Sequence, residues 1–495
     1  MTKTKSQKIL TWTTKDVVLN VITYVANMLV LAALFVLFIY IDGRSGVGKG
    51  LEEYISTPAT PLHFLMLLIL TIGAMLLYFV FEDKNFLKNA ANSEMLFLIV
   101  EITLVVCFAC EQLNIYVRPL ALVALLTLFL TNRRNAIFMN FIFCIVVFLF
   151  DAFTGTSFNF GENSAFNYGN YPALLMGFTS GLVAALCMDK VYSRSRLLLM
   201  SFLISLPSLI CVVMTVIEHG GSNVALDLVF GVASGPLAVA LLMVLLPVFE
   251  SWFKRVSCFK FSELIEHNAK LIKKMIHQAP GTFNHSIVVS NIAEACAAAI
   301  DEDALLARTC AYYHDIGKLR RPEFFKENQA DGVNPHDDLT PELSANIIKS
   351  HTQDGYDLIM RNRLPKEIAD ACQQHHGTLP IVYFYGKAQK FTDGEVDLAQ
   401  YCYAGPKPQT KIAAILMIAD GCEAAARSLQ DRSRENVKRV VRQIVNERMQ
   451  LGQFEECEIT LKELNIIIHT VVNHLTGVYH SRIEYPKVSL DGMEL

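Results

Sequence analysis

Charged residues are scarce in the first half of this 495-residue chain. Residues 1–250 hold 29 charged residues, whereas residues 251–495 hold 61. The whole chain is 18% charged, against about 25% in a typical soluble protein. This division predicts a membrane half followed by a water-soluble half, and it excludes a secreted protein, a disordered chain and an outer-membrane barrel.

The chain also lacks an excess of positive charge. Its formal net charge is −4, and the soluble half has 29 Lys and Arg against 32 Asp and Glu. A protein that binds nucleic acid usually presents a basic face. The charge balance therefore argues against a nucleic acid polymer as a partner.

Eight apolar runs are long enough to cross about 30 Å of hydrocarbon. They cover residues 18–41, 63–81, 95–111, 116–131, 135–152, 171–188, 197–217 and 226–249. With the N-terminus inside, the cytoplasmic pieces hold eleven Lys and Arg, and the external pieces hold only Arg44, Lys49 and Arg118. Positive residues favour the cytoplasmic side, so the C-terminal half is predicted to be cytoplasmic. The first run is too long for a signal peptide and is interpreted as an uncleaved anchor.

External loops are predicted to contain none of the twelve cysteines, so we expect free thiols.

Glu101 is the one ionisable residue near the middle of a predicted span. A charged group there is either functional or faces the bundle interior, bonded to a Ser, Thr or Tyr. None of the spans has the charge pattern of a transporter or a voltage sensor.

The soluble half has helical spacing and few strand signals, so the fold class is predicted to be all-α. Helices are expected at 282–300, 304–314, 342–362, 366–376, 410–429, 434–450 and 461–475. Residues 319–341 are expected to be a loop. Residues 377–409 are rich in aromatic residues, Gly and Pro, and are interpreted as a functional flap.

Histidines concentrate in one part of the soluble half, where seven of the 13 lie between His277 and His376. Most of them fall at helix positions that could converge. Asp420 interrupts the apolar run at 415–419, and a buried Asp must be paired or bound to a metal. The candidate ligands are His285, His314, Asp315, His351, His375, His376 and Asp420. Five imidazoles and two carboxylates are more ligands than one tetrahedral zinc ion takes. They suit two metals bridged by a carboxylate.

These residues resemble the H…HD…D pattern of the HD phosphohydrolase superfamily. Longer strings are similar to the PgpH family of seven-transmembrane HD proteins, which hydrolyse cyclic di-AMP. The strings are GTFNHS at 281–286, HDIGK at 314–318, RPEFFKENQ at 321–329, NPHD at 334–337, SHTQDG at 350–355, GPKPQTK at 405–411, EAAARSL at 423–429 and HSRIEYP at 480–486.

The resemblance implies a metal-dependent phosphodiesterase that converts cyclic di-AMP to pApA. One metal would be held by His285, His314, Asp315 and Asp420, and the other by Asp315, His351, His375 and His376. Iron and manganese suit these ligands better than magnesium. Asp315 and Lys318 would be catalytic, and the candidates for substrate contact are Lys318, Arg427, Asn334 and His336.

The resemblance also implies a domain order and a location. We expect an N-terminus and anchor helix at 1–41, an external loop at 42–62, a seven-span bundle at 63–249, a linker helix at 250–280, an HD domain at 281–487 and a tail at 488–495. The protein would span the bacterial plasma (inner) membrane with its catalytic domain in the cytoplasm. The partners would be a cyclic dinucleotide, the lipid bilayer and a second copy of the chain as a homodimer.

The main departure of the chain from the family is the absence of a large extracellular domain, since only residues 42–62 stand where the family usually has it. A milder departure is the segment IADGCE at 418–423, where the family usually has Ser-Val after the Asp. Other functions stay open. The HD domain could hydrolyse another nucleotide, such as cyclic di-GMP, an alarmone or a dNTP. The chain could also be a non-catalytic nucleotide receptor, or a transporter with an HD regulator. The string HHExxDGxGYP, expected of cyclic di-GMP hydrolases, is replaced after His375-His376 by Gly377-Thr378-Leu379.

Overall fold

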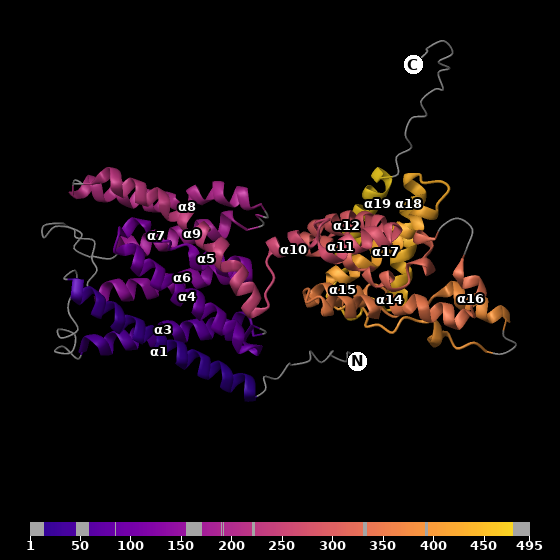
Figure 1. Cartoon of the computed structure of the whole chain (residues 1–495), viewed down its shortest axis with the longest axis horizontal. Helices are drawn as coiled ribbons and strands as arrows, with labels where there is room; N and C mark the ends of the chain where they lie inside the picture. The colour runs from indigo at the N-terminus through magenta and orange to yellow at the C-terminus, as the bar shows by residue number, and fades with distance from the viewer. Residues whose placement is uncertain are drawn as a thin grey trace, which may run out of the picture. The chain divides into compact units, whose positions relative to one another are not determined.

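A computed structural model describes residues 14–45, 59–84, 86–154, 171–189, 191, 193–219, 223–329, 334–391 and 395–478. The chain forms two compact units, residues 1–257 and residues 258–495. Both units are helical, and the described ranges contain no β-strand (Figure 1). The predicted all-α fold class is therefore confirmed.

The first unit is a bundle of apolar helices. They are α1 (Thr14–Ser45), α3 (Ala59–Glu82), α4 (Ala90–Glu111), α5 (Leu122–Leu130), α6 (Arg133–Thr154), α7 (Tyr171–Cys187), α8 (Arg194–His219) and α9 (Val224–Phe253). Six of them are long and apolar enough to cross a membrane. The other two apolar segments, Ile115–Leu130 and Leu174–Cys187, are shorter. Each of the eight predicted runs thus coincides with an apolar segment, although the count of eight membrane crossings is approximate.

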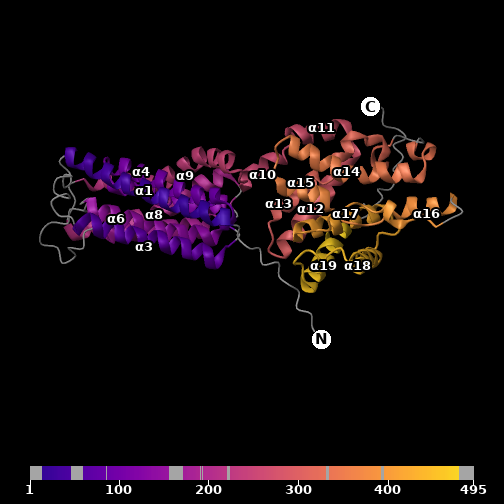
Figure 2. The same cartoon turned by 90° about the horizontal axis from the view of Figure 1, so that it is seen from below.

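Helix α1 lies along α4 (Figure 2). Polar side chains join the two helices. Asn20 donates from Nδ2 to the carbonyl oxygen of Leu87 at 2.6 Å and accepts from Ser93 Oγ at 2.9 Å. Two turns later, Asn27 Nδ2 donates to Glu94 Oε2 at 2.8 Å. Both asparagines are buried. These hydrogen bonds fix the register of α1 against α4, since an amide left unpaired in an apolar bundle is costly.

Arg118 follows a short 3-10 helix, η2 (Ile115–Val117), and is buried in the bundle. Its guanidinium reaches both oxygens of Asp151 at 3.0 Å and Glu111 Oε2 at 3.3 Å. Beside it, Asn114 Nδ2 donates to Asp227 Oδ1 at 2.7 Å. The sequence places Arg118 in an external piece between two spans. The structure adds that the short connection between α4 and α5 packs back into the bundle and buries this residue.

Glu101 faces the interior of the bundle, which is one of the two readings that the sequence offered. Its Oε1 atom has no hydrogen-bond partner among the described residues, so the expected bond to a Ser, Thr or Tyr is not formed by that oxygen. All twelve cysteines are free thiols, as predicted.

The second unit contains ten helices in its described part. They are α10 (Cys258–Leu264), α11 (Lys270–Gln278), α12 (Pro280–Ala299), α13 (Ala304–Tyr313), α14 (Pro341–Arg361), α15 (Lys366–Gln374), α16 (Val382–Phe391), α17 (Lys411–Ser428), α18 (Arg434–Gln450) and α19 (Leu461–Val478). Helix α12 contacts α13, α17 and α19, and α13 and α15 also contact α17. The buried faces of α12 and α17 are built from small and aliphatic side chains, which lets these helices approach closely.

Local sequence signals set most of the helix boundaries. Asp303 caps α13, where its side chain accepts from the Leu306 N–H at 2.9 Å. Helix α12 begins at Pro280, two residues before the predicted Thr282, because proline needs no N–H partner in a first turn. The expected flap contains α16, and the loop at 319–341 contains several short 3-10 helices. Most of the external loop at 42–62, the string at 480–486 and the tail at 488–495 lie outside the described residues.

Replacing Arg118 with methionine should lower the free energy of unfolding of the membrane unit by about 3–5 kcal/mol, because it leaves Asp151 and Glu111 buried without their cation. Thermal unfolding of the full chain in detergent micelles measures this loss. Arg133→Met is the matched control, since its side chain is 57% exposed and its ion pair with Asp189 should contribute less than about 1 kcal/mol. Equal losses for the two variants would contradict the buried assignment of Arg118.

Candidate metal centre

The seven predicted ligands come together in the second unit. They are contributed by α12 (His285), by the end of α13 (His314 and Asp315), by α14 (His351), by the end of α15 (His375 and His376) and by α17 (Asp420). In three groups of these side chains, one ligand atom from each residue lies within 4.8 Å of the others. The groups are His285 with His314 and Asp420, His351 with His375 and His376, and His314 with Asp315 and His375.

A glycine turn places Asp315 at the centre. The chain leaves α13 through the short 3-10 helix η3 (Ile316–Arg320). A Cβ at Gly317 would lie 1.9 Å from the carbonyl oxygen of His351 and 2.5 Å from the amide nitrogen of Gly355. No larger residue fits there, so the turn packs directly on the backbone of α14. This close approach brings Asp315 next to His351.

Each oxygen of Asp315 faces a different pair of histidines. Oδ2 lies 3.3 Å from Nε2 of His314 and 3.7 Å from Nε2 of His285. Oδ1 lies 3.3 Å from Nε2 of His351 and 3.7 Å from Nε2 of His375. A single buried carboxylate therefore lies between two sets of imidazoles.

Three of the histidines are oriented by their own helices. Nδ1 of His314, His351 and His375 lies 2.6–2.7 Å from the carbonyl oxygen three residues earlier in each case. A carbonyl oxygen only accepts, so each Nδ1 must donate, and Nε2 is left to face the centre. His285 is oriented differently, because its Nδ1 lies 2.6 Å from Glu423 Oε2 and its Nε2 lies 3.0 Å from Asp420 Oδ1.

The donor set fits divalent metal ions. His314 Nε2 and both oxygens of Asp315 are buried and make no hydrogen bond of good geometry among the described residues. Buried polar atoms are normally satisfied, and a cluster of imidazoles and carboxylates whose lone pairs converge is what a transition metal requires. His376 and Asp420 are the most exposed of the seven, with side chains 22% and 14% accessible, so the cluster opens to solvent on their side.

Charges within the cluster set its protonation in the absence of metal. Burial alone would raise the pKa of Asp315, but the positive charges of His314 and Lys318 outweigh it and hold this pKa well below its usual range. Burial would likewise lower the pKa of His314, yet Asp315 raises it to about 10. Burial lowers the pKa of His351 to about 3. Without metal, His314 therefore carries a proton at neutral pH. Although burial opposes the shift, the carboxylates of Asp420 and Glu423 also raise the pKa of His285.

Lys318 and its partners close one side of the centre. Its Nζ lies 2.7 Å from Asp315 Oδ2 and 2.8 Å from Glu327 Oε1. The residues around Glu327 are held against the start of α12, where Thr282 Oγ1 donates to Glu327 and the Thr282 N–H donates to Asn328. A Cβ at Gly281 would lie 1.8 Å from the Glu327 carbonyl oxygen, so glycine is required at this contact.

The other predicted substrate contacts are not part of the cluster. Arg427 pairs with Glu423, His336 donates from Nε2 to the Phe324 carbonyl oxygen at 2.9 Å, and Asn334 caps the turn that carries His336. Their roles in substrate contact stay predictions. The sequence also missed Tyr403, whose ring lies 4.4 Å from that of His376, and Glu423. Glu423 follows Asp420 by three residues, and that spacing on one helix face was a usable signal.

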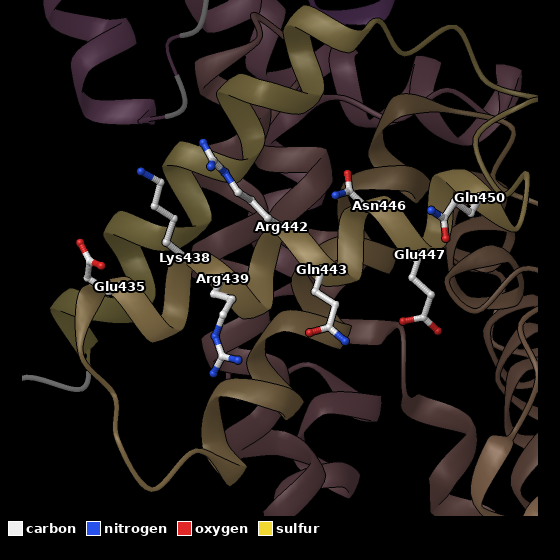
Figure 3. Close-up of a pocket in the computed structure, with 8 residues that line it drawn as sticks. All are labelled: Glu435, Lys438, Arg439, Arg442, Gln443, Asn446, Glu447 and Gln450. Carbon is white, nitrogen blue, oxygen red and sulfur yellow. The ribbon is translucent and has the colours of Figure 1, made fainter.

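A hollow along α18 is separate from this centre (Figure 3). Its lining residues all come from one polar face of that helix: Glu435, Lys438, Arg439, Arg442, Gln443, Asn446, Glu447 and Gln450. It contains none of the seven candidate ligands.

Comparison with known families agrees with this geometry. Residues 61–257 match the family described as "7TM receptor with intracellular HD hydrolase", and residues 282–425 match the HD domain. The chain thus contains a membrane region similar to that of this family, followed by an HD domain. It is accordingly a multi-pass membrane protein, and its HD hydrolase domain implies divalent metal binding.

Two curated members of the HD hydrolase family are similar over much of the chain. Cyclic-di-AMP phosphodiesterase PgpH of Bacillus subtilis (strain 168) is 37% identical over 443 residues, which cover 87% of this chain and 60% of the relative. The PgpH of Listeria monocytogenes serotype 1/2a (strain 10403S) is 40% identical over 311 residues, covering 62% and 43% respectively. The chain thus spans 60% or less of the lengths of these relatives.

Solved structures of the L. monocytogenes PgpH HD domain are also similar. The structure in complex with cyclic-di-AMP is 47% identical and is matched over 100% of its own length and 43% of this chain, with a TM-score of 0.42.

Metal binding should strengthen as the pH rises. His314 is protonated below its pKa of about 10, so a metal that uses its Nε2 must displace a proton. Affinity for Mn²⁺ should therefore increase by about tenfold per pH unit between about pH 6.5 and about pH 8.5. Calorimetric titration of the full chain in buffers of different ionisation enthalpy measures the released proton. An affinity that does not change with pH, without proton release, would contradict this assignment.

Proposed function

We propose that this chain is a membrane-anchored phosphodiesterase that uses two divalent metal ions to hydrolyse cyclic di-AMP to pApA. The observation that carries the proposal is the position of Asp315, with one oxygen toward His285 and His314 and the other toward His351 and His375. A carboxylate between two groups of imidazoles suits a pair of cations that it bridges.

The substrate is proposed from the relatives. Both curated relatives carry the name cyclic-di-AMP phosphodiesterase, and they are 37% and 40% identical to this chain over 443 and 311 residues. The residues after His375-His376 do not have the pattern expected of cyclic di-GMP hydrolases.

Iron or manganese is the proposed metal, because a donor set with five imidazoles suits these ions better than magnesium, which prefers oxygen ligands and retained waters. When bound at these residues, such ions would supply a water of lowered pKa and would neutralise charge on the phosphate oxygens.

The chain's own residues keep the donors in place and in the required charge state. Asp315 stays ionised because Lys318 and His314 lie beside it, and three imidazoles are turned by backbone carbonyls so that Nε2 faces inward. Burial would lower the pKa of Lys318, but Asp315 and Glu327 raise it, so the ammonium stays charged at neutral pH. A fixed cation at this point suits the developing negative charge on a phosphate.

We place the HD domain on the cytoplasmic side of a bacterial plasma membrane. Eleven of the fourteen Lys and Arg in residues 1–250 lie in pieces that this topology puts inside, and Lys254 and Arg255 follow the last span. The homodimer expected from the sequence stays a prediction.

A substrate panel tests the proposed function. The full chain in detergent, loaded with Mn²⁺, should convert cyclic di-AMP to pApA and leave cyclic di-GMP, pApA and an alarmone unchanged. Asp315→Ala should lose both metal and activity, because both sets of imidazoles lose their shared carboxylate. Asp338→Ala, which removes an exposed carboxylate, is the matched control and should retain both.

The other possible results of this panel would each reject a different part of the proposal. Turnover of a different nucleotide would reject cyclic di-AMP as the substrate while keeping the metal centre. Two bound metals without any turnover would reject the enzyme and favour the receptor. An Asp315→Ala protein that kept metal and activity would reject the centre itself.

Tyr403 should contribute to substrate affinity. Its ring lies beside His376, where the cluster opens to solvent, and an aromatic ring at such an opening suits stacking on a base. In the proposed reaction, Tyr403→Ala should raise KM for cyclic di-AMP about tenfold to a hundredfold with a smaller change in kcat. Tyr383→Ala, an exposed aromatic residue on α16, serves as the control in steady-state kinetics. A fall in kcat at unchanged KM would argue against stacking.

A further inference from the structure

Both ring nitrogens of His285 contact carboxylates of a single helix. Helix α17 supplies Asp420, whose Oδ1 lies 3.0 Å from Nε2, and Glu423, whose Oε2 lies 2.6 Å from Nδ1. The two carboxylates are three residues apart and therefore share one face of α17. Because His285 belongs to α12, this double contact fixes the orientation of the ring and the packing of the two helices together.

Glu423 is itself held in place. Its side chain is 1% exposed, and its second oxygen, Oε1, accepts from Arg427 Nε at 3.0 Å and from Nη2 at 2.5 Å. Arg427 lies one turn further along the same helix, with its side chain 45% exposed. One oxygen of Glu423 is thus committed to the histidine and the other to the guanidinium. The arginine compensates the buried negative charge and keeps Glu423 from turning toward the centre as a ligand.

The partner of His285 differs in kind from the partners of the other oriented histidines. Nδ1 of His314, His351 and His375 meets a neutral backbone carbonyl, whereas Nδ1 of His285 meets a carboxylate. A full negative charge on the acceptor draws the Nδ1 proton more strongly and makes Nε2 a better electron-pair donor to a metal. The group of His285, His314 and Asp420 therefore has a support that the group of His351, His375 and His376 lacks.

We infer that Glu423, clamped by Arg427, is a positioning residue that fixes the Nδ1–H tautomer of His285 and makes the His285–His314–Asp420 site the tighter of the two metal sites. The inference deepens the proposed function and rests on its two-metal centre. It assigns to Arg427 a role through Glu423 rather than through the substrate.

A purely structural role for Glu423 makes a different prediction. If the ion pair served only to join α12 to α17, an uncharged side chain of the same shape would preserve metal binding as long as the fold survived. Glutamine at position 423 can still accept from Nδ1–H through its amide oxygen, but it carries no charge. The Glu423→Gln variant therefore separates the charge from the shape.

The experiment uses the full chain in detergent and Mn²⁺ as the probe. Metal-free protein is dialysed against increasing Mn²⁺, the bound metal is counted by atomic emission, and the spin-coupled signal of a Mn²⁺ pair is followed by electron paramagnetic resonance. The wild type should bind Mn²⁺ in two steps, with the His285–His314–Asp420 site filled first as an isolated ion. Glu423→Gln should weaken this tighter site by about tenfold to a hundredfold, so that the first, high-affinity step of the titration moves to higher Mn²⁺. Glu435→Gln, an exposed carboxylate on α18, is the matched control and should behave as the wild type.

Arg427→Met provides a second and milder variant, because its side chain is half exposed and its loss leaves Glu423 in place without the clamp. It should weaken the same site by less than Glu423→Gln does. This variant decides the question if Glu423→Gln does not fold, as judged by circular dichroism of the metal-free protein. Two sites of unchanged affinity in the folded variants would overturn the inference.

Metal counts and turnover distinguish the two proposals. A wild-type chain that binds two ions but does not hydrolyse cyclic di-AMP would reject the proposed function and leave the role of Glu423 to be decided by the metal titration. A chain that hydrolyses cyclic di-AMP, with a Glu423→Gln variant that keeps the high-affinity first step of the Mn²⁺ titration, would reject the role of Glu423 alone.

Discussion

One buried carboxylate determines how the second unit is built. The two oxygens of Asp315 each face two imidazoles, and the side chain makes no well-formed hydrogen bond to relieve its burial. Such a group is stable only among the charges that surround it and the cations that the site is suited to hold. The helices that carry the histidines must therefore converge on this one residue, and their ends are placed accordingly.

Backbone contacts make that convergence possible. Gly317 lets the turn after Asp315 lie against the backbone of α14, and Gly281 lets the start of α12 lie against the residues around Glu327. At both positions the space for a side chain is occupied by a carbonyl oxygen. The histidine side chains are then oriented by acceptors within a few residues or on one facing helix. The geometry of the centre thus depends on helix ends and close backbone approaches rather than on long flexible side chains.

Periodicity and residue type were sufficient to predict the apolar helices and the convergence of seven His and Asp side chains, because both follow from local pattern and from the rarity of buried carboxylates. The burial of Arg118 could not be predicted. A short connection between two apolar runs has the same sequence pattern whether it lies at the surface or packs among the helices. The pairing of Arg427 with Glu423 was accessible in principle from their four-residue spacing. The position of Tyr403 was not, because it depends on how the flap residues fold over the end of α15.

The polar contacts between α1 and α4 limit how the first helix can move. Asn20 and Asn27 are seven residues apart, and each has its partner on or just before α4. A small sliding or rotation of α1 would break these bonds and leave the buried amides of Asn20 and Asn27 unpaired, so intermediate positions are disfavoured. An axial displacement of α1 that re-forms such bonds would have to span one helical turn, which is about 5.4 Å. A stimulus acting on the first helix would therefore reach the rest of the bundle as a discrete step and not as a graded one.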